Sequence, residues 1–337
     1  MSYLILVANC FPVRGYTRSI ICDTIRNRYE FIPNSLYELL KKYNKCTIGE
    51  IREDFEEEED WRIIETYLAF LREKEFVFFS DHPELFPDVE CGWESPLPVT
   101  NAVVDYDGSS DHDMAKIMAE LSDLRCEALE IRTFSAMDGH KLDGTLEFMN
   151  DSSLRCIFLL LRYHPDYSVP FLSELIKKHK RVMHITVHST PEEVINGHDP
   201  ESNLRIFYIN DRIESESHCG AISKFNFCVN MSLFMESHSF NNCLNKKISI
   251  DKGGQIRNCP SSGNSYGHHR SSSLKDALEN PGFKKNWHIT KDQIRVCKDC
   301  EFRYICTDCR VYTEDEKDPY AKPVKCKYDP YSGIWAQ

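Results

Sequence analysis

The stretch CKDCEFRYICTDC, residues 297–309, contains two CxxC pairs that are separated by five residues. A CxxC places two thiolates on one tight turn, within reach of a single soft metal, and two such turns can surround one metal centre or serve two. Further cysteines flank this stretch: Cys243 and Cys259 lie on the two arms of a hairpin-like segment with a Gly-Gly turn, and Cys326 follows. These seven cysteines predict metal binding in the last third of the chain, with a fold whose stability depends on the metal.

The composition is that of a globular chain with an excess of thiols. The 337 residues are 41% hydrophobic and 28% charged, and nine of the fifteen cysteines fall within residues 219–337. In a reducing compartment such a crowd indicates a metal site rather than a disulfide framework. No apolar run reaches the roughly 18–20 residues that a membrane helix needs, and no basic segment precedes the apolar start of the chain. We therefore expect a cytoplasmic protein without a membrane partner.

Residues 1–80 predict a small winged-helix domain. Segments rich in Ile, Val, Tyr and Phe are typical of strands, and three helical stretches follow them. The second helix opens at Thr47 with Glu50 three residues later, which is a capping box. The prolines of residues 81–98 mark a linker. In chain order, strands are expected over 2–9, 18–23 and 28–32, helices over 35–43, from Thr47 onward and over 60–74, and a closing strand over 76–79.

Residues 99–218 alternate strand-like and helix-like segments. Strict alternation predicts βαβ units and a mainly parallel sheet, either open or a partial barrel, so the predicted fold class is α/β. From about residue 219 the periodic pattern fades and cysteine, glycine and serine dominate, which predicts a separate Cys-rich domain over 219–337. The expected strands lie near 101–106, 127–132, 155–161, 181–187 and 204–209, and the expected helices near 110–124, 143–150, 169–180 and after Pro191.

The cysteine array resembles the SPASM domain, the C-terminal extension of many peptide-modifying radical SAM enzymes. The spacing over 243–326, C-x10-G-x4-C, then C-x2-C-x5-C-x2-C, then a final cysteine, follows the family pattern except for two residues instead of three between Cys306 and Cys309. The resemblance implies two [4Fe-4S] clusters. It assigns Cys243, Cys259 and Cys309 to the first cluster, and Cys297, Cys300, Cys306 and Cys326 to the second.

Two questions about these ligands stay open at this stage. The first cluster lacks a fourth ligand, for which the upstream candidates are Cys228 and His238, with Cys219 further away. The second question is the metal, because four of the thiols can also form a closed tetrahedral zinc site that only staples the fold. These four are Cys297, Cys300, Cys306 and Cys309. Iron–sulfur binding explains more of the array, since zinc leaves the hairpin cysteines and Cys326 without a role.

The residues for radical chemistry are missing. A radical SAM enzyme holds its cluster with C-x3-C-x2-C, whereas no two cysteines of residues 1–218 lie within ten residues of each other. Residues 99–218 resemble a radical SAM partial barrel in pattern only, so the resemblance implies a degenerate barrel without an S-adenosylmethionine site and without an identified catalytic residue. Asp105, Asp107 and residues 111–113 follow the first barrel strand, and we interpret them as a helix N-cap first and a divalent-metal site second.

Two histidine pairs have competing interpretations. His184 and His188 share one face of a strand, which favours a structural role over metal ligation. His268 and His269 lie in a stretch rich in glycine and serine, which favours an exposed loop over a site for a metal or an acidic peptide.

The N-terminal segment resembles a RiPP recognition element, the winged-helix domain that binds leader peptides in ribosomal peptide (RiPP) maturation. DNA binding is disfavoured, because residues 50–60 carry eight carboxylates and one arginine and the net charge is −12; dimerisation is a third possibility. The resemblance implies that a leader peptide adds as a strand to the sheet edge and packs against the third helix. The matching residues are Tyr29, Phe31, Tyr67 and Leu71, for which ordinary core packing is the alternative.

The whole chain resembles the SPASM component of "grasp-with-spasm" systems, on the segments NCFPVRGYTRSII, PNSLYELL and YDPY-x3-W. There, a SPASM protein without the radical SAM motif accompanies an ATP-grasp ligase and a short precursor peptide. The resemblance implies a protein of graspetide-type maturation that binds the leader and presents the precursor to the ligase; whether it is itself an enzyme stays open. The alternatives are a peptide-modifying iron–sulfur enzyme with an open-coordination cluster and a zinc-stapled interaction module.

Overall fold

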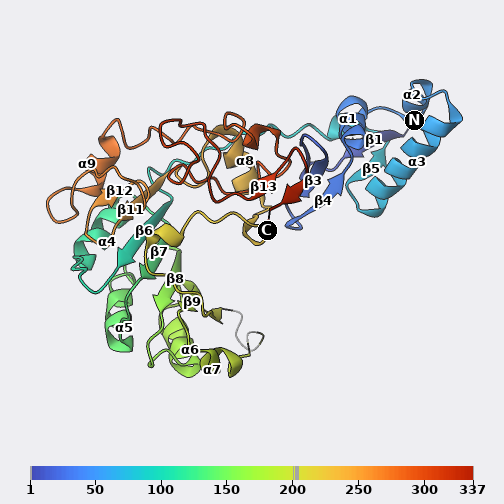
Figure 1. Cartoon of the computed structure of the whole chain (residues 1–337). Coiled ribbons are helices and arrows are strands. Elements are labelled where there is room, and N and C mark those ends of the chain that lie inside the picture. Colours follow the sequence, from blue (N-terminus) through green and yellow to red (C-terminus); the bar gives the residue numbers. More distant parts are fainter. Residues whose placement is uncertain (1, 200, 202–204, 337) are drawn as a thin grey trace. The chain divides into compact units, whose positions relative to one another are not determined.

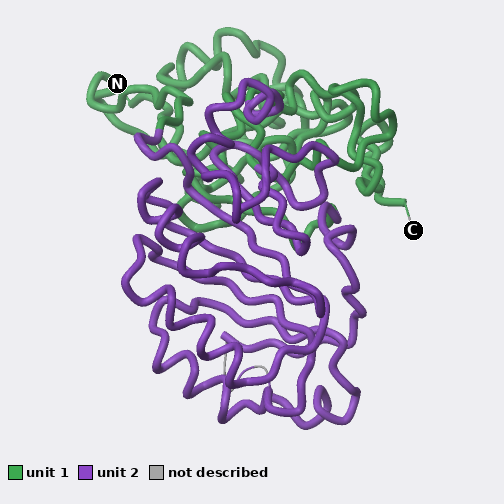
Figure 2. Tube along the Cα trace, turned by 90° about the vertical axis from the view of Figure 1, so that its left-hand side faces the viewer, with its two compact units in different colours: residues 1–94, 222–242, 288–337 green, residues 95–221, 243–287 purple. Residues whose placement is uncertain are grey.

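The computed structural model describes residues 2–199, 201 and 205–336. The chain forms two compact units: unit 1 comprises residues 1–94, 222–242 and 288–337, and unit 2 comprises residues 95–221 and 243–287 (Figure 2). These units regroup the predicted domains. The Cys-rich segment expected over 219–337 is divided between the units, and the N-terminal segment shares unit 1 with the C-terminal end. Long-range contacts produce this grouping, and local sequence patterns do not encode them.

Unit 1 begins with short strands and three helices, close to the predicted order (Figure 1). The elements are β1(Tyr3–Leu6), β2(Cys10–Arg14), β3(Ser19–Asp23), β4(Arg28–Ile32), α1(Asn34–Tyr43), α2(Ile48–Glu53), α3(Glu58–Glu73), β5(Val77–Ser80) and η1(Pro83–Leu85). β1 pairs with β5, and β2, β3 and β4 form a separate antiparallel sheet. The strand predicted over 2–9 is confirmed as the shorter β1, which a turn follows, and β2 was not predicted. Pro12 obscured β2, although proline is tolerated in an edge strand such as this one.

The capping box at α2 is confirmed. The Thr47 side chain accepts a hydrogen bond from the amide of Glu50 at 3.2 Å, and the Thr47 amide donates to the Glu50 carboxylate at 2.7 Å. Two orphan amides at the helix start are thereby satisfied. On α3, Ile64 and Leu71 are buried in the core, which also contains Leu36 of α1.

The C-terminal parts of unit 1 contain little regular structure. Their elements are η3(Lys224–Asn226), α8(Met231–Ser239), η4(Cys297–Asp299), β13(Tyr328–Asp329) and β14(Ile334–Trp335). The fully buried side chains of Phe302 and Ile305 share a core cluster with Ile20 and Cys22 of β3. The start and the end of the chain therefore build one hydrophobic core in unit 1.

An ion pair reinforces the same junction inside unit 1. Glu301 is fully buried and accepts hydrogen bonds from Nε of Arg18 at 2.9 Å and from the hydroxyl of Tyr328 at 2.5 Å. Gly15 lies so close to Glu301 that a Cβ at this glycine would meet the Glu301 backbone nitrogen at 2.9 Å. Glu301, which directly follows Cys300, thus anchors the cysteine-rich loop to the N-terminal sheet.

Unit 2 is an α/β structure in which strands and helices alternate, as predicted for residues 99–218. Its elements are β6(Asn101–Tyr106), α4(Met114–Asp123), β7(Ala128–Thr133), α5(Gly139–Glu147), β8(Cys156–Arg162), α6(Val169–Lys178), β9(Val182–His188), α7(Glu192–Asn196), β10(Ile206–Tyr208), η2(Glu216–His218), β11(Lys247–Ile250), β12(Ile256–Arg257) and α9(Leu274–Glu279). Within the described ranges the strand order is β10-β9-β8-β7-β6-β11-β12, parallel except for β12. Residue 204 of the predicted last strand lies outside the described residues.

The hairpin of β11 and β12 turns where the sequence predicts, at Gly253 and Gly254. β11 also pairs in parallel with β6 and so extends the sheet of unit 2, a placement that the sequence analysis missed. Gly254 has φ +81°, a left-handed conformation that glycine adopts without steric cost.

The two faces of the sheet differ in exposure. On β8, Ile157 and Leu159 are buried, whereas Phe158 on the opposite face is 41% exposed. Successive side chains of a strand point to opposite faces, so one face belongs to the core and the other is accessible. Separately, no described helix combines the length and the apolar character needed to cross a membrane.

Candidate functional site

Four of the predicted ligands lie in unit 1 and influence one another electrostatically. Cys297 begins η4, and its carbonyl accepts a hydrogen bond from the amide of Cys300 at 3.0 Å within one tight turn. Burial raises the pKa of the Cys297 thiol to about 12, and the neighbouring thiols of Cys306 and Cys326 add to this effect. Burial likewise raises the pKa of Cys306 to about 11, again with a contribution from Cys326. These electrostatic neighbours are the four residues that the resemblance assigns to the second cluster.

Buried polar groups surround this four-cysteine set. Lys291, 5% exposed, donates from Nζ to the carbonyl oxygen of Cys306, and its charge lowers the pKa of that thiol against the effect of burial. Asp308 and Arg310 form an ion pair at 2.7 Å with both side chains 1% exposed. Metals bind thiolates, so the protons that burial favours must leave when a metal enters. Buried thiols beside a lysine fit an iron–sulfur cluster or another soft-metal centre.

A second set of thiols lies in unit 2. The ammonium group of Lys247, at the start of β11, donates to the Cys243 sulfur at 3.6 Å. Burial raises the pKa of the Cys259 thiol to about 12, and Cys243 and Cys219 act in the same direction while Lys247 opposes them. Cys219, Cys243 and Cys259 are therefore electrostatic neighbours around one half-buried lysine.

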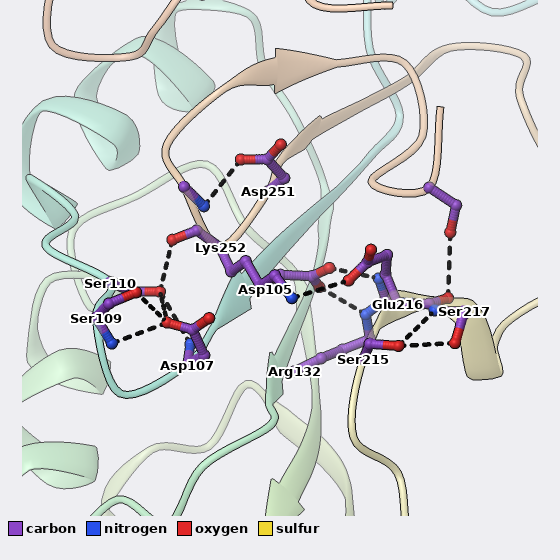
Figure 3. A network of polar contacts seen from close by, with 12 residues as sticks. Asp105, Asp107, Ser109, Ser110, Arg132, Ser215, Glu216, Ser217, Asp251 and Lys252 are labelled. Atoms are coloured by element: carbon purple, nitrogen blue, oxygen red, sulfur yellow. Dashed lines mark hydrogen bonds and ion pairs between the residues drawn. The ribbon is translucent and has the colours of Figure 1, made fainter. Parts of the chain in front are cut away.

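Cys219 is the member of this set that the sequence analysis named only as a more distant candidate. It follows η2, and the carbonyl oxygen of Glu216 in η2 accepts a hydrogen bond from Ser261 at 3.1 Å, two residues beyond Cys259. The Glu216 carboxylate also lies 3.7 Å from the ammonium of Lys252 in the hairpin turn (Figure 3). These contacts hold the segment of Cys219 against the hairpin. No spacing rule relates Cys219 to the array, so only the fold reveals it.

The remaining predicted ligands lie in unit 1. Cys309 belongs to unit 1, whereas Cys243 and Cys259 belong to unit 2. Of the two proposed fourth ligands, the Cys228 thiol accepts a hydrogen bond from Nδ2 of Asn230 at 2.9 Å, and the His238 ring stacks on Tyr304 with 3.8 Å between centroids. Across the described part of the chain, no three or more His, Cys, Asp or Glu side chains converge closely enough to hold a single metal ion.

A buried ion pair occupies the carboxyl ends of β6 and β7. Nε and Nη2 of Arg132 donate to the two carboxylate oxygens of Asp105 at 2.7 and 2.8 Å (Figure 3). The two side chains are 7% and 1% exposed. Burial raises the pKa of Asp105 to about 6, although the hydrogen bonds from Arg132 act in the opposite direction. The geometry is bidentate, so we expect the pair to be ionised at neutral pH.

The loop that follows Asp105 is organised by its own side chains. The Asp107 carboxylate accepts hydrogen bonds from the amide and the hydroxyl of Ser109 at 2.8 and 2.7 Å (Figure 3). Asp113 accepts a hydrogen bond from the amide of Lys116 at 3.0 Å and caps α4. The N-cap interpretation of this acidic loop is confirmed.

A cavity of about 470 Å³ opens on the accessible face of the unit 2 sheet. Its lining combines apolar and charged groups, among them Glu130, Phe158 and Lys247. His184 also lines it, bonded to the hydroxyl of Thr186 at 2.9 Å, and burial lowers the pKa of this histidine. The cavity is suited to an extended ligand with both apolar and polar groups.

The predicted leader-binding residues have unequal surroundings in unit 1. Within the described residues β4 pairs with β3 only, and Phe31 on β4 is 42% exposed. Tyr29 packs edge-on against Phe302 with 5.6 Å between centroids. The Tyr67 hydroxyl is bonded to Ser35 at 2.7 Å. Leu71, in contrast, is 0% exposed, so core packing is its role and it presents no surface to a peptide.

Comparisons with known proteins give matches to solved structures only. No family model matches the chain, and no curated protein matches it. The crystal structure of Streptococcus suis SuiB bound to S-adenosylmethionine matches with 10% identity and a TM-score of 0.34, covering 95% of this chain and 98% of that one. SuiB bound to the precursor peptide SuiA matches with 9% identity and a TM-score of 0.32, with the same coverage. At these values, the fold and the function of this chain are argued from its own residues.

Proposed function

We propose that this chain acts in ribosomal peptide maturation of the graspetide type. It binds the leader of a precursor peptide through the N-terminal sheet of unit 1 and presents the precursor to an ATP-grasp ligase. Two [4Fe-4S] clusters support its cysteine-rich segments, and no S-adenosylmethionine is cleaved. The zinc-stapled module is the alternative from a different class.

The proposal rests on Cys297, Cys300, Cys306 and Cys326, which follow the SPASM-like spacing and of which Cys297 and Cys306 are buried and the other two half-buried. Burial raises the pKa of Cys297, Cys300 and Cys306, so these thiols stay protonated until a metal displaces their protons. A [4Fe-4S] cluster takes four thiolates. The spacing of these cysteines within the SPASM-like array favours iron over zinc.

Anaerobic purification of the full chain tests the metal directly. We expect about eight iron and about eight sulfide per chain, with the broad absorption of iron–sulfur clusters and little zinc. A chain that carries stoichiometric zinc and no sulfide would establish the stapled module instead. A pull-down with a short precursor peptide and an ATP-grasp ligase from the same organism then tests the proposed partners.

We infer that Cys219, rather than Cys228 or His238, is a ligand of the first cluster together with Cys243 and Cys259. Replacing exposed Cys219 by serine removes one thiolate without disturbing a core. We expect iron to fall from about eight to about four per chain. The matched variant Cys228→Ser should keep its full iron content. Iron loss in the Cys228 variant alone would contradict the assignment.

The edge strand β4 provides the surface for the leader peptide. A peptide strand that adds to β4 gains main-chain hydrogen bonds and buries the exposed ring of Phe31. The Phe31→Ala variant should bind the fluorescently labelled precursor about tenfold or more weakly, since an aromatic anchor is lost. Val89→Ala, at a similarly exposed position (41%), is the control. Equal affinity of the wild type and the Phe31 variant, with iron content unchanged, would exclude β4 as the binding edge.

An iron–sulfur enzyme with an open-coordination cluster is the second candidate function. Cys219, Cys243 and Cys259 supply three thiolates, which leave one iron of a cubane free for a ligand if Cys309, which the resemblance also assigns to this cluster, does not bind it. Addition of the precursor to the anaerobic protein should then change the electron paramagnetic resonance spectrum of the reduced cluster. An unchanged spectrum with bound peptide supports the presenting role.

A further inference from the structure

The rings of His112, His269 and Tyr106 form a cluster in unit 2, in which His112 is half-buried and the other two are buried. His112 follows β6 and lies edge-on to His269 with 5.4 Å between ring centroids, and Tyr106 also packs edge-on against His112 at 4.7 Å. His269 is only 1% exposed, so the prediction of an exposed loop is wrong for this residue. Its amide donates to the carbonyl of Gly254 at 3.0 Å, and its own carbonyl accepts from Nζ of Lys116 at 2.6 Å.

Most histidine ring nitrogens of this cluster lack a hydrogen-bond partner. Within the described residues, both ring nitrogens of His269 and Nδ1 of His112 are buried without a hydrogen-bond partner. Nε2 of His112 lies 2.8 Å from the carbonyl oxygen of Asp105, which can only accept, so Nε2 carries the proton. Nδ1 of His112 therefore presents a bare lone pair. A histidine that donates one N–H to a carbonyl and offers the other nitrogen has the arrangement of a metal ligand.

Gly254 makes room for these rings. A Cβ at this position would lie 2.5 Å from Nε2 of His268 and 3.0 Å from Cδ2 of His269, and its φ of +81° also favours glycine. A cavity of about 230 Å³ lies beside the cluster, lined by His112, Gly254 and His268 among others. The charge of Arg270 at its rim is balanced by Asp111 at 2.7 Å.

We propose that His112 and His269 bind one divalent transition-metal ion, with the remaining coordination positions open to water or a ligand group from the adjacent cavity. Two imidazoles on one zinc ion, with Zn–N distances of about 2.0–2.1 Å, place their ring centroids on the order of 5 Å apart, close to the separation here. Imidazole nitrogens suit zinc, copper, iron and nickel. The site uses two protein ligands and lies at the carboxyl end of β6, the edge where parallel sheets bind ligands.

The test is a zinc titration of the full chain, after anaerobic cluster reconstitution has occupied the metal-binding thiols. Calorimetry should detect one saturable zinc site per chain, and zinc should raise the melting temperature. His269→Phe keeps a planar aromatic ring, slightly larger than imidazole, and removes only nitrogens that lack a partner, so this variant should have close to wild-type stability without zinc. It should bind zinc at least about tenfold more weakly.

His112→Phe should weaken zinc binding to the same extent, with some loss of stability because it also removes the hydrogen bond to the Asp105 carbonyl. His140→Ala, on the exposed face of α5, should bind zinc like the wild type. Iron content should be unchanged in all three variants, which separates this proposal from that of the clusters. Absence of saturable zinc binding in the wild type, or undiminished binding in the His269 variant, would overturn the proposal.

Discussion

The Cys300→Ala protein is expected to lose one cluster and to unfold the cysteine-rich parts of unit 1. Iron should fall from about eight to about four per chain, because a [4Fe-4S] cluster needs its thiolates. Residues 222–242 and 288–337 have few regular elements, so we expect the proposed cluster to supply folding energy that helices and strands do not. Hydrogen exchange should show that these residues lose most of their protection. Atomic absorption gives the metal count.

The exposed Cys91 provides the control that separates loss of the cluster from the loss of any one thiol. Cys91 is exposed and also lies in unit 1, and Cys91→Ala should keep the wild-type iron content, melting temperature and exchange pattern. If the Cys300 variant keeps both its metal and its stability, the second cluster is not held by the predicted residues, and the proposed function loses its main support.

The Arg132→Met variant is expected to destabilise unit 2 by about 3–5 kcal/mol, because it leaves the Asp105 carboxylate buried and unpaired. Both oxygens of that carboxylate accept hydrogen bonds from Arg132 at 2.7 and 2.8 Å, and the carboxylate side chain is 1% exposed. Methionine fills much of the arginine volume, so packing changes little. Urea unfolding measured on the reconstituted protein checks the value.

The double variant Asp105→Leu with Arg132→Met provides the control. Replacing a buried ion pair by apolar residues of similar size is often neutral or stabilising, so the double variant should recover most of the loss. If the single variant loses less than about 1 kcal/mol of unfolding free energy, the ion pair contributes no more than a solvent-exposed pair does. Such a result would mean that water reaches the site.

The parallel sheet was predictable because its signals are local. The runs that became β6, β7, β8 and β9 are apolar, short and separated by helical patterns, and the structure places each within a residue or two of its predicted range. Local side-chain chemistry also gave the capping box at Thr47 and the N-cap at Asp113.

The features that the sequence analysis did not predict depend on contacts between segments that are distant in the sequence. Nothing near the hairpin indicates that β11 pairs with β6, and nothing near Cys219 relates it to Cys259. His269 lies in a polar, glycine-rich stretch, yet its backbone contacts with Gly254 and Lys116 bury it. The helical spacing of Leu71 fits a peptide-binding face and a core face equally well. Its complete burial in the structure shows that it belongs to the core face.

The shared core of unit 1 has a consequence for biosynthesis. Ile20 and Cys22 emerge from the ribosome long before Phe302 and Ile305, which cover them in the finished protein. At about 5–20 residues per second, the nascent chain carries this uncovered apolar surface for on the order of 10 to 60 s. Chaperone binding is therefore natural for this chain, and the proposed second cluster can form only after Cys326 has been synthesised.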